Sequence, residues 1–300
     1  MRIDVACAGT PFLDLIFRGL PRLPGPGEEV LASEVAILPG GMANVAFGLR
    51  QLGLDAVICA PIGTDPAGHL LGELLAEAGV PWLGRPGPAT PISIGLPLDG
   101  DRAYVTAAPE IELDVEAVIG LAPRAIVVDL PLALSFPPGP PVYAVVGDPE
   151  VALLAGRMPE TLLGLRVLIT NEREARLLAE ASDAEAAATA LAERGCLVIV
   201  TLGPGGAIAA RPDGAVFRSA AIPGEPVDTV GAGDLFTAAF VWADLLGRSV
   251  QDGLEVAAAY ASLSLAVPSA RQKGLTVEAF RQALVARGTG QFEWIEEVMR

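Results

Sequence analysis

The chain has 300 residues, of which 52% are hydrophobic, and its 36 acidic and 20 basic side chains give a net charge of −16. This length allows one large α/β domain or two ordinary domains, and the apolar content excludes a disordered or fibrous protein. So acidic a surface repels nucleic acids and anionic membranes at long range, and we expect neither as a partner. A small anion held locally by backbone amides remains compatible with this charge.

The counts of histidine, lysine and cysteine exclude further chemistries. His69 is the only histidine and cannot build a multi-histidine metal site. Lys273 is the only lysine, and it stands in RQKGL, outside any phosphate-binding P-loop motif. The three cysteines lie in separate apolar runs without a CxxC pair, which is typical of free thiols in a reducing compartment. With no signal peptide and no apolar stretch of about 18 residues, we expect a cytoplasmic protein.

Short apolar runs alternate with amphipathic stretches, which predicts β–α alternation around a mostly parallel sheet. The strands are expected at residues 3–9, 55–62, 124–130, 142–147, 166–170 and 196–202. The helices are expected at 43–52, 66–79, within 172–194, and at 232–246, 250–266, 276–286 and 291–299.

Two segments, 12–38 and 90–108, break this rhythm with alternating polar and apolar residues. Asp99-Gly100 is a favoured two-residue hairpin loop within the second segment. Short antiparallel strands inserted into a parallel α/β body indicate a lid. We therefore expect residues 1–300 to form a single domain that carries a β lid.

The strongest functional signal is the segment DTVGAGD, which precedes an amphipathic helix. Gly231, Ala232 and Gly233 would let the backbone approach an anion with the free amides of the helix start. Asp234 beside such an anion site would suit a base that deprotonates a nucleophile attacking a phosphate. An acid in the first turn of a helix is also common for structural reasons, and this alternative stays open.

Two segments beside predicted strands could line a ligand site. Gly203 and Gly206 follow a strand in TLGPGGA, where α/β folds bind ligands, although a plain turn explains them equally well. Asn171 and Glu174 have nearly the spacing of a capping box, which is a strong structural alternative to a functional role.

A third segment combines glycines with a polar residue at a helix start. Gly40 and Gly41 precede a predicted helix, and Asn44 lies near the beginning of that helix. Asn44 would then lie at the site-facing end of that helix. It could equally be an N-cap or turn asparagine.

Together these segments resemble the ribokinase-like (PfkB) carbohydrate kinase family over nearly the whole chain. The most specific piece is D-T-x-G-A-G-D, matched at every fixed position by residues 228–234. The resemblance implies a three-layer α/β/α sandwich with a mostly parallel central sheet and a small β-strand lid. It implies transfer of the γ-phosphoryl group of ATP to a hydroxymethyl group of a ribose-, fructose- or ketodeoxygluconate-like carbohydrate.

The resemblance also implies residue roles. Asp234 looks like the catalytic base, and Gly231, Ala232 and Gly233 look like the groups that stabilise the transferring phosphoryl. Substrate binding is implied for Asp14, Gly40, Gly41 and Asn44. Nucleotide binding is implied for Asn171, Thr201, Gly203, Gly206, Asp228, Thr229 and Tyr260, and a place near Mg²⁺ for Glu174. Arg102, in the lid hairpin, could contact a substrate oxygen or be an exposed turn residue.

ATP and Mg²⁺ are the implied cofactors, and a monovalent cation such as K⁺ is left open. Because lid strands often pair across a two-fold axis in relatives, a homodimer through the lid is one expected state. Two alternatives remain. A nucleoside kinase of the same family would have an apolar pocket for a base beside the sugar. A catalytically silent sugar-binding regulator would have no need of Asp234 as a base.

Overall fold

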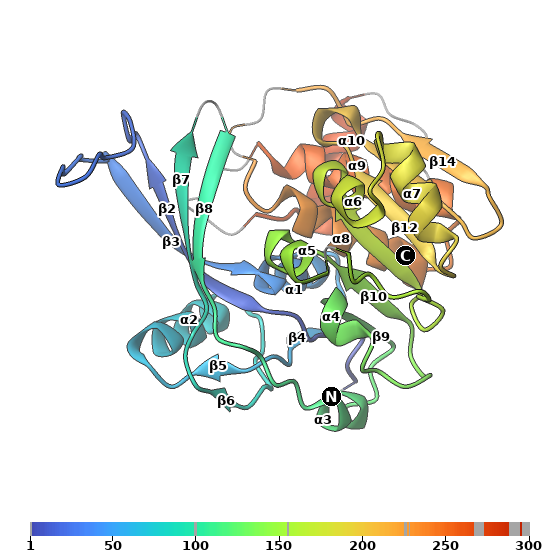
Figure 1. Ribbon diagram of the computed structural model, residues 1–300, viewed down its shortest axis with the longest axis horizontal. Coiled ribbons are helices and arrows are strands. Elements are labelled where there is room, and N and C mark those ends of the chain that lie inside the picture. Colours follow the sequence, from blue (N-terminus) through green and yellow to red (C-terminus); the bar gives the residue numbers. More distant parts are fainter. Residues whose placement is uncertain are drawn as a thin grey trace.

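The computed structural model describes residues 2–98, 101–154, 156–224, 227, 229–266, 273–287 and 295, with the side chains of residues 101 and 102 left out. A large central sheet lies between two layers of helices, and a smaller sheet projects from one side of this body (Figure 1). The sequence predicted both features. The mostly parallel α/β sandwich is thereby confirmed.

The central sheet has eight strands in the described part of the chain, in the order β14-β13-β12-β11-β10-β9-β1-β4. Six strands run parallel: β1 (Val5–Cys7), β4 (Ala56–Ile58), β9 (Ala125–Asp129), β10 (Val142–Val145), β11 (Val167–Asn171) and β12 (Leu197–Thr201). The sheet ends in the antiparallel strands β13 (Ala207–Ala210) and β14 (Val216–Ser219). Nearly all side chains of the parallel strands are buried, as expected for a sheet covered on both faces.

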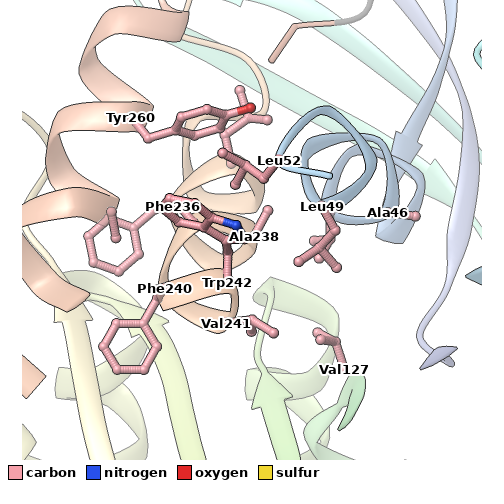
Figure 2. Packing of buried hydrophobic residues seen from close by; sticks show 14 of the residues in the cluster. Ala46, Leu49, Leu52, Val127, Phe236, Ala238, Phe240, Val241, Trp242 and Tyr260 are labelled. Carbon is pink, nitrogen blue, oxygen red and sulfur yellow. The ribbon is translucent and has the colours of Figure 1, made fainter. Parts of the chain in front are cut away.

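Alternate residues of the strands point into two separate apolar clusters. Val127 of β9 belongs to one cluster, and its neighbours Ile126 and Val128 belong to the other. The first cluster is covered by α1 (Met42–Gln51), α2 (Pro66–Glu77), α8 (Ala232–Leu245), α9 (Val250–Ser264) and α10 (Val277–Ala286). The second is covered by α3 (Val115–Gly120), α4 (Leu130–Ala133), α5 (Asp148–Leu154), α6 (Glu172–Ala179) and α7 (Ala184–Ala192). Figure 2 shows Trp242 of α8 packed between α1 and α9 in the first cluster.

The small sheet has the strand order β3-β2-β7-β8. Its strands β2 (Pro11–Arg18), β3 (Glu34–Gly41), β7 (Ile92–Leu98) and β8 (Asp101–Ala107) lie within or next to the two alternating segments. Leu98 pairs with Asp101 across the hairpin, whose loop residues Asp99 and Gly100 lie outside the described residues. A further two-stranded pair, β5 (Ile62–Gly63) with β6 (Pro86–Gly87), lies near α2.

The long periodic elements begin and end within a few residues of their predicted limits. The short elements α3, α4, α5, β5, β6 and β14 were not predicted. The helix expected at 291–299 falls, except for Ile295, outside the described residues. Within the described ranges, no helix combines the length and the apolar character that a membrane crossing requires.

Candidate active site

Two helix starts meet at the carboxyl ends of the parallel strands, where open α/β sheets bind ligands. The Asn44 Nδ2 atom in the first turn of α1 donates a hydrogen bond of 2.9 Å to Oδ2 of Asp234 in the first turn of α8. One turn further on, a Cβ atom at Gly48 would lie only 2.9 Å from Cβ of Ala238. Glycine at this position therefore allows the two helices to approach closely enough for Asn44 and Asp234 to join.

Asp234 is a partly buried carboxyl group with a raised pKa. Burial is the main cause, and it raises the pKa of Asp234 to about 7 with a contribution from the negative charge of Asp129. The hydrogen bond from Asn44 opposes this shift because it stabilises the carboxylate. A carboxyl group with a pKa near neutrality is well matched to proton transfer at physiological pH.

The backbone next to Asp234 has the conformation expected of an anion site. Gly231 is the N-cap of α8 with a φ of 76°, a left-handed conformation that favours glycine. A Cβ atom there would lie 3.4 Å from Nδ2 of Asn44. The first four amides of a helix have no partner within the helix and carry the positive end of its dipole. The α8 start can therefore present amides to an anion beside Asp234.

Asp14 of β2 approaches the same position from the small sheet. Only 7% of Asp14 is exposed, and a Cβ atom at Gly40 of β3 would lie 1.8 Å from its Oδ2 atom. Gly40 thus leaves the space that the Asp14 carboxyl group fills. Burial, together with the charge of Asp234, raises the pKa of Asp14 to about 7. Gly41 has a φ of 56° and is the N-cap of α1, so it links the small sheet to Asn44.

Asp129 is a site residue that the sequence analysis missed. It ends β9, and its Oδ2 atom accepts hydrogen bonds from the Thr10 amide (2.8 Å) and from Thr10 Oγ1 (2.7 Å). Thr10 stands between β1 and β2, and its carbonyl accepts the amide of Met42 at the start of α1. Asp129 therefore fastens the connection between the two sheets. The available signal was an acid at the carboxyl end of a buried strand.

The predicted capping box at α6 is formed. Asn171 Oδ1 accepts the Glu174 amide over 2.9 Å, and Glu174 Oε2 accepts the Asn171 amide over 3.0 Å. Glu174 Oε2 also accepts Thr170 Oγ1 over 3.0 Å, and only 6% of Glu174 is exposed. Burial raises the pKa of Glu174 despite these bonds. The structural alternative is thus present, and a metal role for Glu174 stays a prediction.

A groove of about 680 Å³ begins at this capping box. It brings together three residues predicted to bind a nucleotide, namely Asn171, Thr201 and Gly203, and Arg173 and Arg176 also line it. Gly206, which is also predicted to bind the nucleotide, is required by the backbone conformation. It has a φ of 90°, and a Cβ atom there would lie 2.0 Å from the carbonyl oxygen of Ser219.

Further carboxyl groups stand close to Glu174. Burial and the charges of Asp129 and Glu174 raise the pKa of Glu150 to about 7, and the charge of Asp148 raises the pKa of Glu174. Asp148 also forms an ion pair with Arg173. Among the described residues, no three His, Cys, Asp or Glu side chains come together as a metal cage. Mg²⁺ is commonly held by one or two carboxylates together with substrate phosphates, so this oxygen donor set fits it.

Four predicted site residues remain, and their environments differ. Tyr260 is fully buried, donates a hydrogen bond of 2.8 Å to the Leu275 carbonyl and packs edge-on against Phe280. The apolar helix α9 places Tyr260 in the core, which corrects the expectation that Tyr260 binds the nucleotide. Asp228 and the Arg102 side chain lie outside the described residues. Thr229 is exposed beside the anion site.

The chain is similar to known carbohydrate kinases. Residues 3–82 and 148–276 match the pfkB family carbohydrate kinases. The chain is 28% identical over 283 residues to the acarbose 7(IV)-phosphotransferase of Actinoplanes sp., covering 89% of this chain and 94% of that protein. It is 29% identical over 289 residues to the ATP-dependent ribose-1-phosphate kinase of Halopiger xanaduensis, covering 90% and 94%.

The fold is also found among solved structures. The Arabidopsis thaliana ribokinase complexed with ribose and ATP superposes with a TM-score of 0.76 and 24% identity, over 95% of this chain and 99% of that one. That identity supports the fold alone. The family match covers most of the chain and includes Asp234 and its glycines. The chain therefore belongs to the pfkB family of carbohydrate kinases, which are phosphotransferases with an alcohol group as acceptor.

Proposed function

We propose that the protein transfers the γ-phosphoryl group of ATP to a hydroxymethyl group of a ribose-, fructose- or ketodeoxygluconate-like carbohydrate. The single observation that carries this proposal is the 2.9 Å bond between Asn44 and Asp234. It places a carboxyl group of raised pKa between the small sheet and the glycine-rich start of α8. A sugar hydroxyl at this point would meet a base on one side and an anion site on the other.

Asp234 acts as the base in this proposal. It takes the proton of the attacking hydroxyl, a role worth about 10²–10⁴-fold in rate. The backbone of Gly231, Ala232 and Gly233 stabilises the negative charge that develops on the phosphoryl group, where each donor contributes on the order of 10²–10³ in rate. Phosphoryl transfer requires mainly such positioning and charge stabilisation.

Asp14 and Asn44 hold the sugar hydroxyls, with Gly40 and Gly41 shaping the space around them. The buried position of Asp14 above Gly40 supports this role, because a buried polar group is costly unless it finds a partner. The small sheet acts as a lid that excludes water and so limits ATP hydrolysis. A contact from Arg102 to the substrate remains a prediction.

Asn171, Thr201, Gly203, Gly206, Asp228 and Thr229 form the nucleotide side of the site. Glu174, supported by Asp148 and Glu150, would help to hold Mg²⁺ next to the ATP phosphates. Bound Mg²⁺ would supply positive charge that neutralises the phosphates. Whether K⁺ adds to the rate is tested by including and omitting it in the assay.

Apolar residues on the two edge strands of the small sheet support a homodimer. Ile37 of β3 and Val105 of β8 lie at the ends of one row that crosses the sheet through Leu15 and Ile94. Ile37 is 40% exposed and Val105 is 61% exposed. Exposed apolar side chains on edge strands favour association with a second copy. Analytical ultracentrifugation should detect a dimer that the Ile37→Lys, Val105→Lys double variant dissociates.

A coupled ATP-consumption assay with a panel of sugars, sugar phosphates and nucleosides tests the proposed function. Turnover on one or more free sugars supports it. Turnover confined to nucleosides would assign a nucleoside kinase instead. Sugar binding measured by calorimetry, without turnover on any compound, would assign a regulator and contradict the proposal.

A further inference from the structure

Lys273 is the only lysine of the chain, and it is buried behind the anion site with 6% of its surface exposed. The segment that carries it is held firmly in place. A Cβ atom at Gly274 would lie 3.3 Å from both Phe47 of α1 and the Tyr260 hydroxyl. That hydroxyl donates to the Leu275 carbonyl over 2.8 Å. The backbone that follows Lys273 therefore packs against both α1 and α9.

The Lys273 Nζ atom donates a hydrogen bond of 2.9 Å to the carbonyl oxygen of Val230. This carbonyl and the amide of Gly231 belong to one planar peptide unit. Gly231 is the N-cap of α8 and lies beside Asn44 and Asp234. A cation thus stands at one end of a peptide whose other end opens the anion site.

We propose that Lys273 is a positioning residue for phosphoryl transfer, which fixes the Val230–Gly231 peptide and strengthens its amide as a donor to the transferring phosphoryl group. The proposal rests on the proposed function of the Gly231–Gly233 segment. Lys273 itself contacts no substrate in this account. Its effect passes through one peptide bond.

Two physical effects support this role. A hydrogen bond to a carbonyl polarises the peptide, and an adjacent bond made by its N–H becomes stronger. A positive charge in a dry environment also acts over a longer range than one in water. Asp14, Asp129 and Asp234 place negative charge around the same point, so a phosphoryl group bound there depends on strong donors.

The position of Lys273 also argues against a merely mechanical role. An apolar side chain could anchor this segment without removing an ammonium group from water, which costs free energy unless acceptors replace its hydration. One acceptor is the carbonyl of the peptide that leads into Gly231. The charge is therefore placed where it acts on the anion site.

The first test measures nucleotide binding without any sugar. Calorimetry with Mg²⁺ gives the ratio of the ADP dissociation constant to that of a non-hydrolysable ATP analogue. We expect Lys273→Met to lower this ratio by about 5-fold or more, because the Gly231 amide becomes a weaker donor to the terminal phosphate. Thr276→Ala is the matched control, since it removes the N-cap of α10 in the same segment and leaves the charge in place. An unchanged ratio in Lys273→Met would overturn the proposal.

The second test separates the charge from the fold. With a sugar that the parent phosphorylates, kcat of Lys273→Met should fall by about 10²-fold, as for loss of one anion-site donor, while the sugar KM stays within about threefold. Lys273→Arg should retain more activity than Lys273→Met, and methylammonium should partly restore Lys273→Ala. If Lys273→Met and Thr276→Ala both lose only thermal stability, Lys273 is a structural anchor. If the parent phosphorylates no sugar, the proposed function fails, while the nucleotide ratio still decides the role of Lys273.

Discussion

Asn44 and Asp234, 190 positions apart in the chain, are joined by one hydrogen bond of 2.9 Å between the first turns of α1 and α8. The bond depends on helix packing, because Gly48 contacts Ala238 one turn further along each helix. The packing of α1 against α8 in the core therefore sets the distance between Asn44 and Asp234 in the site. Each residue at this meeting point has a distinct measurable role.

Asn44→Ala should raise the sugar KM by at least about tenfold and leave the ATP KM nearly unchanged. A lost hydrogen bond contributes about 0.5–1.5 kcal/mol, and more where the remaining group is buried. The Asn44 bond also lowers the pKa of Asp234, so its loss should move the acidic limb of the kcat/KM profile to higher pH. Steady-state kinetics between pH 5 and 9 check both effects. An equal rise in the sugar KM and the ATP KM would contradict the assignment of Asn44 to the sugar side of the site.

Gly40→Ala should disable sugar binding through Asp14. The added Cβ atom would lie 1.8 Å from the Asp14 carboxyl oxygen, so the carboxyl group must move. We expect the sugar KM to rise as much as in Asp14→Ala, with the ATP KM nearly constant in both variants. Gly72→Ala in α2 is the matched control, because a Cβ atom there meets nothing within 4 Å. A normal sugar KM in Gly40→Ala would show that the position of Asp14 is not critical.

Asp14→Asn should stabilise the protein at pH 8 while weakening sugar binding. The pKa of Asp14 is about 7 in the folded protein and 3.8 in its ordinary state, so the folded state binds the proton more tightly. Stability is therefore lost as the pH rises through this interval, at about 1.4 kcal/mol for each pKa unit. Asparagine carries no charge and avoids this loss. Calorimetry should show a higher Tm for the variant at pH 8 and little difference at pH 4.

Asp65→Asn is the control of opposite sign. Hydrogen bonds from Thr90 and Gly68 lower the pKa of Asp65, so its charge stabilises the fold above its ordinary pKa. This variant should have a lower Tm than the parent at pH 8, and the difference should shrink as the pH falls. A Tm gain in Asp14→Asn that is equal at pH 4 and pH 8 would rule out the electrostatic explanation.

The sequence was informative about some of these residues and silent about others. The long amphipathic helices and buried strands follow from periodicity, and Asp234 follows from a glycine-rich segment before a helix. Asp129 escaped notice because its partner Thr10 lies 119 positions away, and no local pattern records that contact. The misassignment of Tyr260 has a related cause. Helix α9 carries apolar residues of its own on most of its faces, so its sequence does not tell which face is buried.

Glu174→Gln should raise the Mg²⁺ concentration needed for half-maximal rate. Glutamine keeps an oxygen that can accept the Asn171 amide and Thr170 hydroxyl, so the capping box should survive with little loss of Tm. The variant lacks the negative charge with which Glu174 would attract Mg²⁺. Asp183→Ala serves as the control, because it removes the N-cap of α7 and should lower Tm at an unchanged Mg²⁺ requirement. If Glu174→Gln behaves like Asp183→Ala, Glu174 is only a capping residue.

Asp234→Asn gives the most direct test of the proposed chemistry. Asparagine keeps the size of the side chain and a partner for Asn44, but it removes the base and one negative charge. If Asp234 served only the dipole of α8, the change would cost about 0.3–1 kcal/mol of stability and leave turnover intact. If Asp234 is the base, kcat should fall by about 10²–10⁴-fold in a folded protein.

ATP binding separates the two roles further. A carboxylate next to the γ-phosphate repels it before the reaction, so ATP affinity in Asp234→Asn should hold or improve while kcat falls. The burial that raises the pKa of Asp234 should also raise the stability of this variant at pH 8, where the parent carries a buried charge. Loss of turnover, retained ATP affinity and a raised Tm form a pattern that a damaged helix start cannot produce. A kcat within threefold of the parent would contradict the role of Asp234 as the base.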